Sequence, residues 1–439
     1  MKVNGLVPPT YKAGGKLVLL PITPMSRPTT LPNELIHSIL GYINESDGNQ
    51  ALNACMPVSS QFLEIARSYV WRELQIEPVN VKKVAAKIKP EIARHVRELY
   101  IESGLRKTWL RDSKGLGFCL HHDFSKLQKL SLAFVTWASL SAANRKRLHE
   151  LTQTPAFQDL RIIGVKDMPP TLIVGLTRLR HLVASSITMS TRPISLRPYT
   201  GRRTHLKTLS LAWVLGERND TSWQEQVQGI VNLLSLLLSP MSPISLTELS
   251  AISVNIQLLT ILRPDLSRII EGCSETLECL KIRAGENLTH PGTQGLWEQT
   301  NEPLYLARHT ALKSIFVHIE CPEDDRLNFL INTLAPLGPA TPLREITICV
   351  NDERVTRPLR HSDRLPYLDN VLARLKSFHL RRCTRERNFA GAIMAGLPRS
   401  ASMISFIKLP LDSDSLLEQF SINESPHVDP WEGAVPLTL

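Results

Sequence analysis

The sequence of this 439-residue chain predicts an α/β solenoid with one strand and one helix per repeat, preceded by a small three-helix unit. Three observations lead to this fold class. A short apolar motif recurs about every 31 residues through most of the chain. Amphipathic helical stretches separate its copies. A compact segment near the N-terminus has only helical periodicity.

The recurring motif has the form apolar-x-x-apolar-x-apolar. Its last three positions alternate, which is typical of a short strand with its apolar residues on one face. The steps between copies vary from about 22 to 40 residues, so the repeat is irregular. The copies begin at Val96, Leu127, Phe157, Leu179, Leu206, Leu246, Leu277, Leu312, Leu343, Leu375 and Ile404.

Helices are expected between the copies. The clearest begins at the capping-box spacing of Ser222 and Glu225 and ends near Pro240. Others are expected at 264–273, 324–334 and 367–372. One strand and one helix cannot bury their own apolar faces, whereas stacked neighbours can, which favours a solenoid. The alternative is a compact α/β domain whose buried strands share this spacing.

Residues 31–76 form the expected helical unit. An apolar stripe at spacings of three and four predicts a first helix from Leu31 to Ile43. A second helix stops at Pro57, and a third follows the candidate caps Ser59 and Ser60. Three short helices bury little apolar surface, so this unit should rely on the rest of the chain or on a partner.

Composition sets the remaining boundaries. Residues 1–30 are rich in Pro, Gly and Thr and are expected to be a flexible leader, whereas 77–409 hold the repeats. Residues 410–439 form an acidic tail with a charge of −6 and no Lys or Arg. The total is +10, so the middle of the chain is basic, although only modestly for its size.

The sequence offers no catalytic or metal-binding constellation. It has no Gly-rich phosphate loop and no Gly-x-Ser-x-Gly elbow. The segment from Cys119 to Asp123 contains ligand-type residues, but no second pair completes a tetrahedral set. We therefore expect no cofactor, no metal and no enzymatic activity. The seven cysteines without a Cys-x-x-Cys pair, and the lack of a long apolar run, favour a cytoplasmic or nuclear protein that does not enter membranes.

A binding surface is the remaining prediction. In each strand the residues between the apolar anchors share the opposite face of the sheet. Polar residues on that face, punctuated by aromatic ones, suit protein recognition. The candidate target-binding residues are Tyr100, Arg161, Lys281, Phe316, His379 and Phe406.

Two resemblances give this surface a context. Leu-Pro-x-Glu-Leu at 31–35, Ile39-Leu40, Val58-Ser59 and Trp71-Arg-x-Leu74 resemble an F-box. The repeats resemble degenerate leucine-rich repeats, although most lack the usual Asn or Cys after the third anchor. The F-box resemblance implies docking on a Skp-type linker, and the residues that match the family's docking face are Leu31, Pro32, Leu35, Leu40, Val58 and Trp71. Some of these six must instead pack the unit's own core, and the sequence does not separate the two sets.

Together the resemblances imply a substrate receptor of SCF-type cullin–RING ubiquitin ligases. Its partners would be the Skp-type linker, the cullin ligase subunits and a target protein that the sequence does not identify. One alternative is an interaction scaffold outside any ligase, with the helical unit as an N-terminal cap. Basic clusters such as Arg145-Lys146-Arg147 also leave open a nucleic-acid-associated repeat protein. An enzyme with a dispersed site is the last alternative.

Overall fold

The chain forms two compact units, the first ending at Val70 and the second beginning at Trp71. The predicted leader and acidic tail lie outside the described residues. The computed structural model describes residues 31–46, 48–103, 109–112, 114–190, 201, 203–212, 223–240, 242–283, 304–319, 324–338, 341–350, 364–375, 379–383, 399 and 404–407.

The first unit has the three expected helices, α1 (Asn33–Ser46), α2 (Gly48–Cys55) and α3 (Ser60–Val70). Each helix packs against the other two. The hydroxyl of Ser59 accepts a hydrogen bond from the backbone N–H of Phe62 at 3.2 Å, which caps α3 as predicted. The core of the unit is small and consists of Ile36, Leu40, Leu52, Ile65 and Ala66.

The structure moves the end of the helical unit six residues upstream of the predicted boundary at Ile76. Residues Glu73–Ile76 form strand β1, which pairs in parallel with β2 (Glu98–Glu102). Leu74 and Ile76 are buried in the core of the second unit. The alternation in Glu73-Leu-Gln-Ile76 is a strand pattern, and it was concealed by its position directly after a helix.

The described residues of the second unit form a twelve-stranded parallel sheet in which the strands follow one another in chain order, β1-β2-β3-β4-β5-β7-β9-β10-β11-β12-β13-β14. A separate parallel pair joins β6 (Thr204–His205) and β8 (Ile244–Ser245). The remaining strands are β3 (Lys129–Ala133), β4 (Asp159–Ile163), β5 (His181–Ser185), β7 (Thr208–Ala212), β9 (Ala251–Asn255), β10 (Cys279–Arg283), β11 (Ser314–Ile319), β12 (Glu345–Val350), β13 (His379–Cys383) and β14 (Ile404–Ile407).

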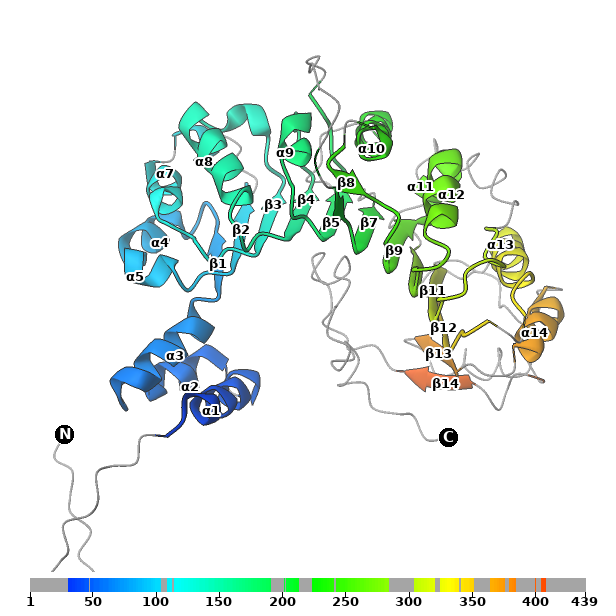
Figure 1. Cartoon of the computed structure of the whole chain (residues 1–439), viewed down its shortest axis with the longest axis horizontal. Coiled ribbons are helices and arrows are strands. Elements are labelled where there is room, and N and C mark those ends of the chain that lie inside the picture. Colours follow the sequence, from blue (N-terminus) through cyan, green and yellow to red (C-terminus); the bar gives the residue numbers. More distant parts are fainter. Residues whose placement is uncertain are drawn as a thin grey trace, which may run out of the picture. The chain divides into compact units, whose positions relative to one another are not determined.

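Helices line the side of the sheet on which the core lies (Figure 1). They are α4 (Val81–Lys87), α5 (Pro90–Ala93), α6 (Trp109–Asp112), α7 (Lys114–His121), α8 (Ala142–Thr152), α9 (Pro170–Val174), α10 (Trp223–Leu238), α11 (Ile256–Ile261), α12 (Arg263–Gly272), α13 (Asp324–Leu334) and α14 (Leu365–Arg374), with a 3₁₀ turn at Trp137–Ser139. The helices predicted at 222–240, 264–273, 324–334 and 367–372 correspond to α10, α12, α13 and α14. The second unit is thus an α/β structure with a solenoid-like succession of strands.

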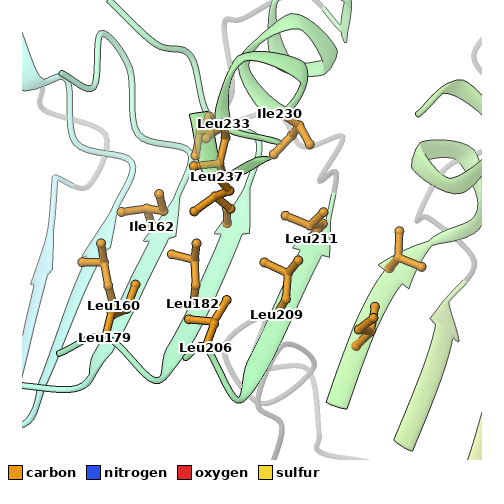
Figure 2. Packing of buried hydrophobic residues seen from close by; sticks show 14 of the residues in the cluster. Leu160, Ile162, Leu179, Leu182, Leu206, Leu209, Leu211, Ile230, Leu233 and Leu237 are labelled. Carbon is orange, nitrogen blue, oxygen red and sulfur yellow. The ribbon is translucent and has the colours of Figure 1, made fainter. Parts of the chain in front are cut away.

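The main core lies between this sheet and its helices. Figure 2 shows Leu182 and Leu209 of neighbouring strands directed toward Leu233 and Leu237 of α10. Strand register aligns one central anchor from each of the twelve strands in a single row, which runs from Leu74 in β1 and Leu99 in β2 to Leu380 and Ile404 in β13 and β14. Each repeat thereby completes the apolar layer of its neighbour.

Two predicted copies of the motif are shifted by three residues. In β9 the anchors are Ile252 and Val254, not Leu249 and Ala251. In β14 the register pairs Ile404 with Leu380, so Ile404 is the second anchor and not the first. An additional apolar residue three positions from the true anchors makes both phases possible in the sequence, and pairing with the neighbouring strand selects one.

The first repeats turn sharply after each strand through residues in the left-handed conformation. Phe134, Gly164 and Ser186 follow β3, β4 and β5 with φ of 56°, 62° and 51°. Their N–H groups extend the ladder; for example, Gly164 donates to the carbonyl of Ser185 at 2.8 Å. The same turn is therefore made by three different residue types, in the region where the resemblance leads one to expect Asn or Cys.

Candidate functional site

Helix α1 is apolar on two sides. Its residues Ile36, Leu40 and Ile43 face α2 and α3, as the helical spacing predicts. A second stripe, Leu35, Ile39 and Tyr42, is exposed. With the exposed Leu31, Pro32 and Val58 it forms what we call the docking face. Five of its six side chains, all but Pro32, are 43% to 73% exposed.

Polar contacts hold the start of α1 against α3. The Gln61 side-chain amide donates to the carbonyl oxygen of Leu31 at 3.2 Å and also to the Asn33 side chain. Farther along, the Tyr69 hydroxyl donates to the carbonyl oxygen of His37 at 3.1 Å. These contacts fix the backbone that carries the docking face, so its apolar side chains do not depend on a partner for their placement.

The structure separates the six predicted linker-docking residues into three groups. Leu31, Pro32, Leu35 and Val58 are exposed on the docking face. Leu40 is fully buried in the core of the first unit, so it packs that core and is removed from the docking candidates. Trp71 belongs to the second unit and packs against that unit's core. Tyr42 was missed, although it lies seven residues after Leu35 and so continues the same stripe.

The second candidate region is the side of the sheet opposite the core, which we call the polar face. Register places four predicted target-binding residues, Tyr100, Arg161, Lys281 and Phe316, in one row across the sheet. Within that row Ser131 pairs with both Tyr100 and Arg161, and Lys281 pairs with Phe316. His379 pairs with Glu345 in the adjacent row. The predicted place of Phe406 on the polar face is corrected. Its register position aligns with that of Arg382 and, through β12, with that of Val317, which is buried in the main core.

Tyr100 is less accessible than predicted. Its ring is buried, with 8% of the residue exposed, and its hydroxyl donates to Glu102 Oε2 at 2.7 Å. Arg161, Lys281 and Phe316 are half-buried. On the polar face, then, the predicted aromatic and charged residues are both only partly exposed.

Ion pairs connect the polar-face residues of β2, β3 and β4. Glu98 lies 2.8 Å from Lys129 Nζ and 3.5 Å from Arg72 Nε. Burial alone would raise the pKa of Glu98, but these cations, with Arg161, hold it below its usual value. Burial dominates at Asp159 and raises its pKa, although Arg161 lies 3.5 Å away.

Metal-binding and thiol chemistry find little support in the described part of the chain. No group of three or more His, Cys, Asp or Glu residues there is placed to hold a metal ion. Cys119, from the ligand-type segment noted in the sequence, is buried in the main core, which raises its pKa to about 11. Among these residues, none of the helices has the length and apolar character needed to cross a membrane.

Comparison with known proteins provides no family assignment: neither a protein-family model nor a curated protein matches the chain. The two candidate surfaces therefore rest on the geometry described above.

Proposed function

We propose that this chain is a substrate-recognition adaptor of an SCF-type cullin–RING ubiquitin ligase. The observation that carries the proposal is the second apolar stripe on α1, because Leu35 and Ile39 are exposed to solvent and lie outside the hydrophobic core of the first unit. A cluster of exposed apolar side chains on a small unit marks a protein-binding surface. The resemblance of 31–74 to an F-box gives that surface a Skp-type linker as its partner.

The second unit would bind the target. Its degenerate leucine-rich repeats offer a long sheet face with charged groups at regular intervals, such as Arg161 and Lys281. The chain itself would make and break no bond. By holding linker and target on one polypeptide, it would raise the effective concentration of the target near the ubiquitin-loaded enzyme.

Linker binding tests the proposal directly. Purified full-length chain is titrated with the Skp-type linker by calorimetry, in wild-type form and as the Leu35→Ala, Ile39→Ala double variant. Truncating two central apolar contacts should weaken binding by roughly 100-fold, since each such contact contributes about 1 to 2 kcal/mol. Val79→Ala is the matched control, because Val79 is an exposed apolar residue of the second unit, outside the docking face.

Two results would contradict the proposal. The first is a wild-type chain that does not bind the linker. The second is equal weakening by the control and by the double variant. Circular dichroism should show unchanged helix content in both variants, because none of the three residues belongs to a hydrophobic core.

The same exposed stripe also fits an interaction scaffold outside any ligase, because an apolar face does not by itself identify its partner. A chain that ignores the linker, yet loses a different partner when Leu35 and Ile39 are truncated, would favour that second function.

A further inference from the structure

A row of hydrogen-bond donors crosses the sheet at the end where its strands begin. We call it the donor row, and its members directly precede β2, β3, β4, β5 and β7: Arg97, Gln128, Gln158, Arg180 and Lys207. The backbone N–H of each later member donates to the carbonyl oxygen of the member before it, at 2.7 to 2.9 Å. The row is therefore as regular as the sheet, with neighbouring members about 4.8 Å apart.

Buried anchors hold the backbone of the donor row. Each member directly follows the first anchor of its repeat, and these anchors all belong to the main core: Val96, Leu127, Phe157, Leu179 and Leu206. Figure 2 shows Leu179 and Leu206 at the end of the sheet where the strands begin. Each member of the row therefore starts from a fixed backbone and needs no partner for its placement.

The two arginines of the donor row are exposed and unpaired. Neither Arg97 nor Arg180 makes an ion pair or a side-chain hydrogen bond with the described part of the chain. Lys207 differs, because its Nζ lies 2.8 Å from Glu248 Oε2. The fold thus neutralises the last cation of the row and leaves the two arginines available.

Two more exposed arginines lie close to Arg180. Arg178 precedes it by two residues, and Arg203 is brought alongside because the hydroxyl of the next residue, Thr204, donates to the carbonyl oxygen of Thr177. Arg178 and Arg203 each donate one N–H to a proline carbonyl oxygen at 3.0 Å. A guanidinium has five N–H donors, so most of them remain available on both side chains. The start of β5 therefore carries three exposed guanidinium groups.

This arrangement suits carboxylates on an extended chain. A guanidinium donates two parallel N–H groups to the two oxygens of a carboxylate. Between Arg97 and Arg180, the half-buried Gln128 and Gln158 make no side-chain hydrogen bond with described residues, so their amides can donate to backbone carbonyls of a ligand. The two arginines are three strand positions apart, about 14 Å, which an extended chain covers in about four residues.

A nucleic-acid strand fits this row less well. Its bases bind by stacking on aromatic side chains, and Phe118 on α7 is the only exposed aromatic residue described between β2 and β7. Its phosphates recur at every nucleotide, whereas two uncharged glutamines separate the arginines of the row. The polar face is also a weaker candidate, because Lys129 and Arg161 there already lie 2.8 and 3.5 Å from Glu98 and Asp159.

We propose that the donor row, together with Arg178 and Arg203, binds an extended, carboxylate-rich segment of a partner protein. Guanidinium–carboxylate pairs hold this segment at Arg97 and at the start of β5, and the glutamine amides bind its backbone between them. The row belongs to the second unit and does not require the linker, whereas the docking face belongs to the first. If the proposed function also holds, the segment is part of the target.

Fluorescence anisotropy with the purified full-length chain tests the proposal. The probe is a fluorescein-labelled peptide of alternating Glu and Ser, about twelve residues long and so able to span the row. The Arg97→Gln, Arg180→Gln double variant should bind it at least about tenfold more weakly than wild type, because two charged donors are lost. Lys83→Gln, Lys87→Gln is the charge-matched control: both lysines are exposed on α4, outside the row, and their loss should leave binding nearly unchanged.

Four results would overturn the proposal. They are no binding of the Glu peptide by wild type, equal binding of a peptide with Gln in place of Glu, equal weakening by the two double variants, and tighter binding of a labelled oligothymidine of the same length. Circular dichroism should show unchanged structure in both variants, since all four substituted side chains are exposed. The Leu35→Ala, Ile39→Ala variant should bind the peptide as wild type does, so failure of the proposed function is recognised separately.

Discussion

Gly229, in the middle of α10, is the residue at which a single methyl group should do most damage. A Cβ there would lie 2.8 Å from the carbonyl carbon of Ile187, closer still to its oxygen, and 3.1 Å from Cα of Thr188. Ordinary contact begins near 3.4 Å, so α10 would have to retreat from the second unit's core by at least about 0.6 Å. The neighbouring backbone cannot rotate away as a flexible side chain could.

The cost follows from what α10 buries. Ile230, Leu233, Leu234 and Leu237 are all nearly inaccessible, and each contributes about 1.5 to 3 kcal/mol by burial. A gap of 0.5 to 1 Å forfeits roughly a quarter to a half of the contact energy. After about 1 kcal/mol is returned by the better helix propensity of Ala, Gly229→Ala should destabilise α10 by about 3 kcal/mol.

Hydrogen exchange on the peptide covering 223–238 measures this locally, which suits a chain whose unfolding need not be two-state. Protection should fall about 100-fold. Gly272→Ala is the matched control, because Gly272 also lies in a helix but has no atom within 4 Å of its would-be Cβ. If Gly229→Ala keeps its protection within threefold of wild type, the close packing of α10 on Ile187 is wrong.

Three further predictions concern stability. Leu40→Ala should cost about 2 to 5 kcal/mol in the unfolding of the first unit by urea, since Leu40 is fully buried; a change below 1 kcal/mol would contradict that placement. Gly164→Ala should destabilise the turn after β4 by at least about 1 to 2 kcal/mol, because it adds a left-handed non-Gly residue and a Cβ 2.6 Å from the Phe134 ring. An unchanged urea midpoint for unfolding of the second unit would refute this prediction. The variants Glu98→Gln and Asp159→Asn should show opposite pH profiles in denaturant titrations. The folded-state pKa of Glu98 is lowered, so its charge adds stability above the unfolded pKa near 4.5, and the difference from Glu98→Gln should vanish as pH falls through the folded pKa. The folded-state pKa of Asp159 is raised, so wild-type stability should fall relative to Asp159→Asn as pH rises above 3.8; parallel profiles would reject both assignments.

The repeat was readable from the sequence because the large aliphatic residues of its strands alternate with residues of other types. The spacing of Leu99-x-Ile101 and Leu130-x-Leu132 predicted which residues enter the core, and register confirms it. The phase failed at β9, where Leu249 and Ile252 both satisfy the pattern. Only hydrogen bonding to β7 decides between them, and the sequence of one segment contains no information about its neighbour.

The candidate sites were harder to predict for a related reason. Leu35 and Leu40 look alike on a helical projection with two apolar stripes, and only the positions of α2 and α3 show which stripe is covered. Tyr100 was expected to be exposed, but its hydroxyl is within reach of Glu102 on the same strand, which draws the ring against the sheet. Exposure is a property of the assembled neighbours and is not encoded locally.

The chain-order succession of strands in the sheet has a consequence for how the second unit unfolds. In the described twelve-stranded sheet, each strand hydrogen-bonds only with its neighbours in that order, so local unfolding affects one or two adjacent repeats and then weakens. Melting should therefore start at weak or terminal repeats and spread stepwise. A chain whose last strands have been unfolded by heat or removed by a protease can therefore keep its first strands folded, together with any ligand bound to them.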